Sequence, residues 1–271
     1  MPALRLLTVA SASLFLLAKA SGNPSQATGE QTEYAVTLDH EGACLSEINA
    51  ARKKAGFNDF IVAKTGDAVT RLPAAGSPDE DDEAEWVWQP VCDVLLPEEA
   101  ASKTKSSPVD SGKEFASGTY AFQVVDANTP DCTAVVEKWK DAYSNINALP
   151  PPKKDSEDFY TNQDNDNVSF VAIYNPSKNA TADCRVVTCT KKVSPGPGPA
   201  LAADGSATKE TKGFALICMT TPDVLSENSE TAPFTEEQWG QIVTALEGSA
   251  SAILPSTLGL AAVFLGVAAA L

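Results

Sequence analysis

Cysteine and histidine are the residues of this chain whose number and spacing decide what chemistry is open to it. An even number of cysteines in a secreted chain predicts a disulfide framework, and the N-terminus discussed below predicts secretion. We therefore expect three disulfides, with the pairing left open, among Cys44, Cys92, Cys132, Cys184, Cys189 and Cys218. A zinc site is the competing interpretation, but the sequence has no C-x-x-C pair and a single His, so we expect no metal and no cofactor.

The shortage of histidine also argues against catalysis. The only His is His40, near the start of the first expected helix, where it is typical of a solvated or capping residue. Ser-His-Asp and Cys-His mechanisms need a base with a pKa near neutrality, and cysteines held in disulfides cannot act as nucleophiles. The segment "PGPGPA" (195–200) lacks the Lys-Ser/Thr of a phosphate loop, and its prolines remove backbone donors. We therefore predict a protein that is not an enzyme.

The charge of the chain restricts its partners. The sequence holds 20 Lys and Arg against 36 Asp and Glu. Removal of residues 1–20 takes away Arg5 and Lys19 and no acid, so 18 basic residues face 36 acidic ones, a net charge of about −18. Such a surface repels phosphate backbones, so nucleic acid is not an expected partner. The densest acidic run, "PDEDDEAE" (78–85), predicts a solvated loop.

The N-terminal 20 residues are typical of a secretory signal peptide. Arg5 gives the positive start, "LLTVASASLFLL" (6–17) the apolar core, and Ala18-Lys19-Ala20 the small-residue cleavage site. Secretion makes N-glycosylation possible at the two sequons, which begin at Asn167 and Asn179.

The C-terminal segment "LGLAAVFLGVAAAL" (258–271) is apolar and uncharged, but a spanning helix needs roughly 20 apolar residues. Small residues at 248–252, a short spacer and this apolar run follow the order of a glycosylphosphatidylinositol (GPI) attachment signal. The lipid-bearing residue is then expected at Gly248, Ser249 or Ala250. A C-terminal membrane helix and a buried core helix are the alternatives. The preferred interpretation places the protein on the outer leaflet of the plasma membrane.

The body between these signals shows three helix patterns. Apolar residues recur at helical spacing in 39–57, where Gly56 is a plausible stop, and in 129–152, where Thr129 is the expected cap. In 234–248, Thr235 and Gln238 predict a capping box, with Phe234 and Trp239 as its hydrophobic staple and Gly248 as its end.

Strand patterns lie between these helices. The β-branched and aromatic runs predict strands at 168–174, 184–190 and 213–220, with a weaker candidate at 118–125. We expect Cys189 and Cys218 on neighbouring strands, and residues 191–212 as a long mobile hairpin loop. Together the patterns predict an α+β fold, with helices packed on an antiparallel sheet.

Four segments, taken in order, carry a resemblance: "CLSEINAARKKAGF", "AVVEKWKDAY", "VSFVAIYNPSKNATADCRVVTC" and "FALICMTTP". Their order resembles the CAP superfamily (cysteine-rich secretory, antigen 5 and pathogenesis-related proteins). Asn49 and Arg52 match its Asn-x-x-Arg helix, Trp139 its Trp-bearing helix, and Tyr174 stands where Trp is usual. With the signal peptide, the six cysteines and the tail, the chain also looks like the GPI-anchored surface antigens of Eimeria-type coccidian parasites.

The resemblance implies a CAP-like three-layer α-β-α sandwich, with an antiparallel sheet flanked by helices and stapled by disulfides. The expected organisation is a signal peptide (1–20), a flexible stem (21–38), one domain (39–248) and an attachment signal that is removed (249–271). CAP proteins often carry a His/Glu tetrad in a central cleft. Ile48 and Ala142 replace two of its members here, and the expected strand before Tyr174 has no His, so this cleft chemistry does not transfer.

By the resemblance, the expected function is that of a non-enzymatic parasite surface antigen, which contributes to host-cell attachment or invasion and to immune exposure. Its expected partners are the host-cell surface, antibodies and, through the lipid anchor, the membrane. One alternative is an extracellular CAP-like binder of a lipid or sterol, which would need a deep apolar pocket. A second is a hydrolase with paired carboxylates, which would need two buried acids with raised pKa values.

Overall fold

The fold is a mixed α and β structure built on a single sheet. The computed structural model describes residues 31–78, 86–97, 115–146, 150–153, 159–160, 166–195, 208–226 and 229–251. The strands are β1 (Gln31–Leu38), β2 (Ile61–Val62), β3 (Thr119–Val125), β4 (Thr181–Ser194) and β5 (Lys209–Thr221). The main path runs β1-β4-β5-β3 and is antiparallel, and β2 adds a short parallel pairing with β4.

Helices lie on both faces of this sheet. The α-helices are α1 (Leu45–Lys54), α2 (Gln89–Leu95), α3 (Cys132–Asp141), α5 (Asp166–Ile173) and α6 (Glu236–Ser251). Two 3₁₀ turns, η1 (Ala68–Thr70) and η3 (Ala142–Asn145), complete the described elements. The antiparallel sheet with helices agrees with the predicted α+β class.

Two cores follow from the alternation of side chains along the strands. Val186 and Leu216 point to one face, where they join the core formed with α1, α3, α5 and α6. Val187 and Ala215, one residue away along each strand, point to the other face and join a core with Trp88 and residues of α2. The first face is called the multi-helix face below and the second the α2 face.

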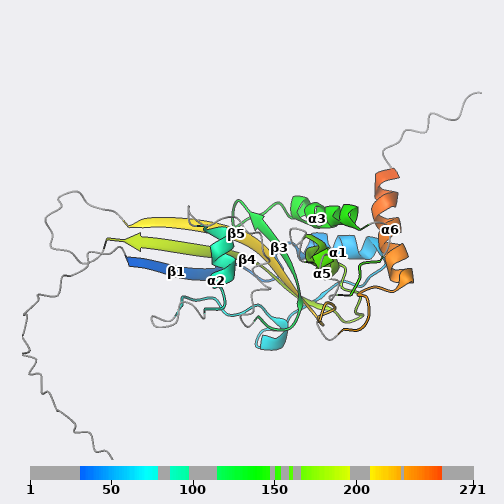
Figure 1. Cartoon of the computed structure of the whole chain (residues 1–271), viewed down its shortest axis with the longest axis horizontal. Coiled ribbons are helices and arrows are strands. Elements are labelled where there is room, and N and C mark those ends of the chain that lie inside the picture. The colour runs from blue at the N-terminus through cyan, green and yellow to red at the C-terminus, as the bar shows by residue number, and fades with distance from the viewer. Residues whose placement is uncertain are drawn as a thin grey trace, which may run out of the picture.

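The long strands of the sheet continue past the helices to one end of the molecule (Figure 1). β3 pairs with β5 only as far as the Val125–Phe214 pair, so β1, β4 and β5 continue as a three-stranded ribbon. This ribbon, residues 31–35, 190–194 and 209–213, is called the arm. Helix α6 lies at the opposite end of the long axis (Figure 1). The chain therefore enters the described structure at one end and leaves it at the other.

The predicted helices are largely confirmed, with shifted ends. Cys44, Ile48, Ala51 and Ala55 are all buried along α1, and Gly56 follows the helix with a φ of 77°, as expected of its stop. The cap of α3 is not Thr129. The side chain of Asp131 accepts a hydrogen bond from the Ala134 amide at 3.0 Å, so the helix begins two residues later than expected. The α-helix also gives way to η3 at Ala142, well before the prolines expected to stop it.

Helix α6 has the predicted capping box. The Thr235 amide donates to Gln238 Oε1 at 3.0 Å, and the Gln238 amide donates to Thr235 Oγ1 at 3.2 Å. Phe234 and Trp239 stack with ring centroids 6.2 Å apart, as the staple requires. The expected end at Gly248 is wrong, because the helix continues to Ser251. Gly248 is exposed and has no neighbouring atom near its Cβ position, so it fits within a helix without strain.

The strand predicted at 168–174 is wrong, because this segment forms α5. Its side chains from Ser169 to Ile173 are buried on every side, packed between β3 and α3. An all-buried run of this length has the same composition in a strand and in a helix, and tertiary packing decides between them.

The other predicted strands are found, and two are longer than expected. β3 matches the candidate at 118–125, while β4 and β5 take in 191–194 and 209–212 from the predicted mobile loop. Residues 31–38, predicted as part of a flexible stem, form β1. Helix α2 was not anticipated, although Pro90 in its first turn is a usual start signal. The acidic run from 79 to 85 lies outside the described residues.

Candidate functional site

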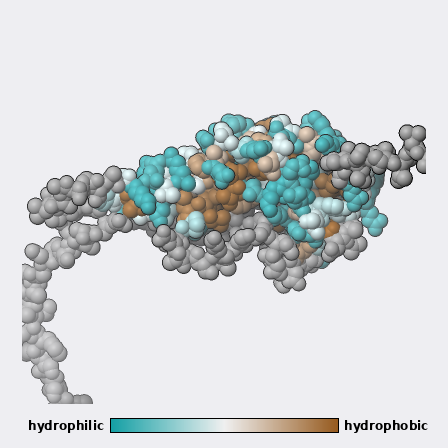
Figure 2. All heavy atoms as spheres, turned by 90° about the horizontal axis from the view of Figure 1, so that it is seen from above, coloured by the Kyte–Doolittle hydropathy of each residue, from teal (hydrophilic) through white to brown (hydrophobic). Residues whose placement is uncertain are grey.

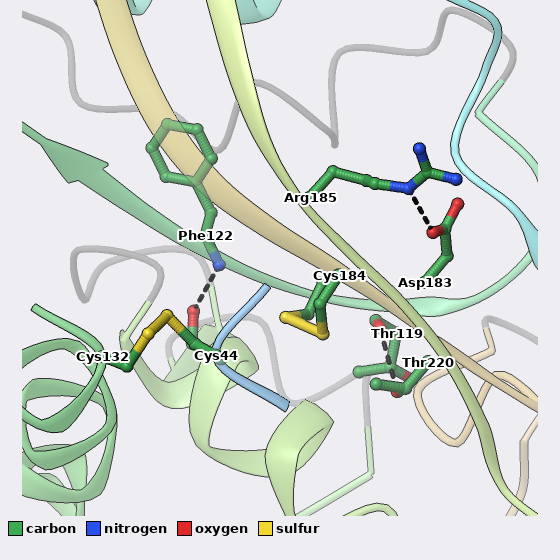
Figure 3. Close-up of a disulfide and its surroundings, with 10 residues drawn as sticks. Cys44, Thr119, Phe122, Cys132, Asp183, Cys184, Arg185 and Thr220 are labelled. Atoms are coloured by element: carbon green, nitrogen blue, oxygen red, sulfur yellow. Dashed lines mark hydrogen bonds and ion pairs between the residues drawn. A yellow bond between two sulfur atoms is a disulfide. The ribbon is translucent and has the colours of Figure 1, made fainter. Parts of the chain in front are cut away.

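Three disulfides cross-link the described helices and strands. Cys44–Cys132 connects the start of α1 to the start of α3, and Cys184–Cys218 crosses between β4 and β5 (Figure 3). Cys92–Cys189 fastens α2 to β4. Cys189 and Cys218 lie on neighbouring strands as predicted, and each pairs with a different cysteine. All six sulfurs are thus oxidised. Disulfide sulfurs are neither nucleophiles nor metal ligands, so these residues hold the framework and do no further chemistry.

The Asn-x-x-Arg pair on α1 holds a loop rather than a ligand. The Asn49 side-chain oxygen accepts a hydrogen bond from the Phe60 amide at 2.9 Å. Arg52 is 1% exposed and donates to the carbonyls of Asn58, at 2.8 Å, and Ile173, at 2.9 Å. Its guanidinium lies 3.7 Å from the centre of the Phe60 ring. The pair therefore ties α1 to the following loop and to the end of α5.

Removing the charged Arg52 guanidinium from water costs free energy and shifts its pKa. Burial lowers the pKa of Arg52 to about 10, while Asp59 and Tyr174 act in the opposite direction. The two carbonyls and the Phe60 ring supply the partial negative charge that keeps the guanidinium stable in this position.

The positions at which the resemblance places cleft residues belong to the main core. Ile48 is 0% exposed, Ala142 2% and Tyr174 1%, and all three join the core on the multi-helix face. Burial raises the pKa of the Tyr174 hydroxyl above its usual value. The Trp139 indole donates to the Phe122 carbonyl at 3.1 Å, which binds α3 to β3. Close packing at these positions does not favour the alternative of a small apolar ligand.

A cluster of four charged residues on the α2 face was not anticipated from the sequence. Arg185 donates to Asp183 at 2.8 Å and to Glu41 at 2.9 Å, and Arg71 donates to the same Glu41 oxygen at 2.6 Å (Figure 3 shows the Arg185–Asp183 bond). Asp183 also accepts from the Leu72 amide at 3.0 Å. An Asp and an Arg two residues apart among the small and apolar residues of 182–187 were the available signal, because they share one face.

This cluster fixes loops onto the sheet. Burial raises the pKa of the Asp183 carboxyl, while the Leu72 amide and Arg71 oppose that rise. Two cations face two carboxylates, so no excess charge is left for a ligand. Because its members come from segments 41, 71–72 and 183–185, the cluster clamps the first two segments against β4. It has the character of a structural ion-pair network.

His40 lies at the surface beside this region. Its side chain is 74% exposed, and its Nδ1 is 3.3 Å from an Asp39 oxygen. The hydrogen bond from the His40 amide lowers the pKa of Asp39. Within the part of the chain that the structure describes, no three His, Cys, Asp or Glu residues converge as a metal site.

The two sequons differ in accessibility. Asn167 is 1% exposed; its side-chain nitrogen donates to the Phe159 carbonyl at 2.8 Å and its oxygen accepts from Asn145 at 3.0 Å. The Asn167 side chain is therefore buried and held by two hydrogen bonds in the folded domain. Asn179 lies exposed in the turn before β4.

The predicted lipid-attachment residues lie in the last turn of α6. Gly248 is exposed, and the side chains of Ser249 and Ala250 are outside the description. None of the described helices is long and apolar enough to cross a bilayer. The apolar tail at 258–271 lies outside the described residues.

Comparison with known proteins places these features in a family. A family model described as the sporozoite surface antigen (SAG) protein domain matches residues 40–261. The sporulated oocyst TA4 antigen of Eimeria tenella is 31% identical over 234 residues, which cover 82% of this chain and 83% of that antigen. No solved structure matches the chain.

Proposed function

The chain belongs to the sporozoite surface antigen (SAG) family of coccidian parasites, and we propose that a GPI anchor holds it on the outer leaflet of the plasma membrane. There it contributes to host-cell attachment and invasion and to immune exposure, without catalysing a reaction. Membership of a surface antigen family supports a place at the cell surface. The anchor and the attachment role are the further steps of the proposal.

The sequence at the two ends supports the anchor. The N-terminal 20 residues have the order of a signal peptide, and the last 24 residues have the order of an attachment signal that is exchanged for a lipid. Helix α6 carries the small residues 248–251 at its C-terminal end. A lipid attached there follows directly on a rigid element of the domain.

The elongated shape is the observation that carries the attachment role. The arm lies at one end of the long axis and α6 at the other (Figure 1). A lipid after α6 therefore leaves the arm, among the described residues, farthest along the long axis from the anchored end. The arm takes in residues 190–194 of β4, which span about 16 Å at the usual strand rise. Placed at the far end, the arm reaches a facing cell before the helical end does.

The disulfide framework supports a long life outside the cell. Each of the three bonds joins two elements that are distant in sequence, and all six cysteines are buried or nearly so. Disulfides of this kind persist in oxidising surroundings. The helices on both faces of the sheet further support the proposal that the domain is a CAP-like three-layer sandwich.

We propose that the folded domain carries an N-glycan at Asn179 and none at Asn167. This sequon is exposed, whereas the Asn167 nitrogen is buried and hydrogen bonded. The expected result is one N-glycan per chain, lost on Asn179→Gln and kept on Ser169→Ala, which destroys the other sequon. Intact mass before and after peptide N-glycosidase treatment measures this, and a glycan that persists in the Asn179→Gln protein contradicts the assignment.

Attachment is tested by displaying the full chain on a suspension cell line and counting its adhesion to cultured epithelial cells. Displaying cells are expected to adhere more than cells with the empty vector. Phosphatidylinositol-specific phospholipase C is expected to abolish the difference, because it releases the protein. Equal adhesion of displaying and control cells, with the protein detected on the surface, contradicts the attachment role.

A further inference from the structure

The register of the sheet decides where the backbone groups of β5 point in the arm. The Val186 carbonyl of β4 accepts a hydrogen bond from the Asp39 amide at 2.9 Å, so the even-numbered residues of β4 direct their backbone groups towards β1. The odd-numbered residues of β4 therefore bond to β5, and their partners there, which include Thr211, bond back. Glu210 and Lys212, on either side of Thr211, direct their amides and carbonyls away from β4.

No strand lies beside these backbone groups in the part of the chain that the structure describes. β3 pairs with β5 only as far as Phe214, two residues before Lys212 is reached. Among the described residues, no backbone hydrogen bond from another segment reaches Glu210 or Lys212 on this edge. A strand edge with free amides and carbonyls is a template on which another strand can pair.

The edge is also accessible on both faces of the sheet. Residues 209–212 are all exposed. Helix α2 reaches Gly213, where a Cβ would lie 2.6 Å from the Leu95 carbonyl oxygen, and leaves Thr211 exposed beyond it. Hydrophilic residues dominate the arm in the space-filling view, and hydrophobic ones gather over the middle of the molecule (Figure 2). A contact at this edge therefore depends on backbone hydrogen bonds and charged side chains rather than on apolar burial.

The charged side chains of this edge are complementary to themselves. Glu210 and Lys212 lie on the same face of β5, with their charged groups 2.9 Å apart. The hydrogen bond that Lys212 donates lowers the pKa of the Glu210 carboxyl, which keeps it charged at neutral pH. When two copies of the edge run antiparallel with their Thr211 residues opposite each other, Glu210 of each copy faces Lys212 of the other.

Other registers oppose like charges. The smallest shift that keeps the free backbone groups of the two edges in line is two residues. Such a shift places the two Glu210 side chains opposite each other in one direction and the two Lys212 side chains in the other. Like charges directly opposite each other destabilise a strand pair, so charge selects the register centred on Thr211.

From this arrangement we propose that the β5 edge of the arm pairs with the same edge of a second copy of the chain. The two copies are related by a two-fold axis that passes between their Thr211 residues, and their arms join into one continuous antiparallel sheet. Each Glu210–Lys212 pair between the copies exchanges both of its backbone hydrogen bonds and adds an ion pair. The Thr211 side chains meet as a cross-strand pair on the α2 face.

The contact is short, so the pairing is weak in solution. It covers a few residues of each chain, which is far below the area of a stable dimer. Many copies held on a surface strengthen such a contact, because they raise its effective concentration. The two-fold axis places the two α6 helices at opposite ends of the paired molecules (Figure 1). With lipid anchors after α6, a setting that rests on the proposed function, the pair suits chains on two facing membranes.

Disulfide trapping tests the pairing directly. In the proposed register the Thr211 residues form a non-hydrogen-bonded pair with Cα atoms about 4.5 Å apart, a distance that a disulfide spans. The purified full-length Thr211→Cys protein is oxidised with copper phenanthroline at about 0.1 mM and run on a non-reducing gel. Thr32→Cys is the matched control, since it is an exposed threonine on the other edge of the same arm. Thr211→Cys is expected to give at least about fivefold more crosslinked dimer than Thr32→Cys.

Charge exchange tests the register. In the Thr211→Cys protein, Glu210→Lys opposes lysines across the interface and is expected to lower crosslinking roughly fivefold. Adding Lys212→Glu reverses both charges of each pair and is expected to restore crosslinking to within about twofold of the starting protein. Glu33→Lys makes the same charge change on β1, at an exposed position of the arm, and is expected to change crosslinking by less than about twofold. Circular dichroism and intact mass check that each variant folds and keeps its native disulfides.

Three results overturn the proposal: no crosslinked dimer of Thr211→Cys, equal crosslinking of Thr32→Cys, or failure of the double charge exchange to restore what Glu210→Lys removes. The variants also separate the pairing from the proposed function. If crosslinking follows the expected pattern but displayed protein does not promote adhesion to epithelial cells, the pairing stands and the attachment role fails. If adhesion is found and the crosslinking pattern is not, attachment stands and the pairing fails.

Discussion

Removing the Cys92–Cys189 disulfide is expected to destabilise the domain more than removing Cys184–Cys218. Both cysteine pairs are buried, with every member at most 1% exposed, so replacing each pair by alanine loses similar packing. The pairs differ in the length of chain that they close. Cys92 and Cys189 are 97 residues apart, whereas Cys184 and Cys218 are 34 apart. The comparison therefore isolates the constraint that each bond places on the unfolded chain.

The magnitude follows from the loop lengths. In the chain-entropy model, a loop of 97 residues corresponds to about 4.7 kcal/mol at 25 °C and a loop of 34 residues to about 3.8 kcal/mol. The other disulfides do not shorten the stretch of chain between the cysteines of either pair. For Cys92 and Cys189, the path that crosses the Cys44–Cys132 bond is longer than the direct path along the chain. The double alanine variant at 92 and 189 is thus expected to lose roughly 1 kcal/mol more than the one at 184 and 218.

Denaturation in guanidinium chloride, followed by far-ultraviolet circular dichroism, measures the free energy of unfolding of the parent and both variants. Both the denaturation midpoint and the slope of the unfolding free energy against denaturant concentration must be measured. Loss of a crosslink expands the unfolded state and so raises this slope. The reasoning is refuted if the 184 and 218 variant is the less stable of the two. It is also refuted if either variant loses less than about 1 kcal/mol.

Two substitutions, each compared with a control variant on an exposed helix position, test the packing. Gly213→Ala places a Cβ 2.6 Å from the Leu95 carbonyl oxygen, so we expect a loss of about 1–3 kcal/mol in thermal or chemical unfolding. Gly240→Ala, in open space on α6, is expected to stabilise by about 0.5–1 kcal/mol, and equal effects of the two changes contradict the assigned contact. Arg52→Met is expected to cost about 2 kcal/mol in the same assay, because two carbonyls lose charge-assisted hydrogen bonds while relief of the buried charge offsets part of that loss. Lys53→Met, at an exposed position of the same helix, is expected to change stability by less than about 0.5 kcal/mol, and a similar loss in both variants contradicts the role given to Arg52.

The sequence predicted the elements whose signals are local. The capping box of α6 depends on Thr235 and Gln238, three residues apart, and both of its hydrogen bonds form. The buried stripe of α1 likewise follows from the spacing of Cys44, Ile48, Ala51 and Ala55. Such features depend on residues within one or two turns of a helix, so a short stretch of sequence predicts them.

Features that depend on distant segments were missed or wrong. Residues 168–173 are helical because β3 and α3 enclose them, which their β-branched composition does not indicate. β1 pairs with β4 across about 150 residues of sequence. Apolar residues at every second position, Tyr34, Val36 and Leu38, were the local signal that the prediction of a flexible stem missed. The charged cluster of the α2 face forms only where three separate segments of the chain meet. Its members are Glu41, Arg71, Asp183 and Arg185. Local propensity cannot report these contacts.

The candidate site shows the same division. The number of disulfides followed from the cysteine count, but the partners of Cys189 and Cys218 depend on where α2 packs and on strand register. The division of Val186 and Val187 between the two cores depends on that register as well, since a shift of one residue would exchange the faces.

The central claim, a lipid-anchored surface antigen, is tested most directly by detergent phase separation of the native protein before and after phosphatidylinositol-specific phospholipase C. The account predicts that the protein starts in the detergent phase and moves to the aqueous phase after treatment, and that no peptide from 258–271 remains. A protein that stays in the detergent phase and still contains that peptide contradicts the lipid anchor. The tail would then be part of the mature chain.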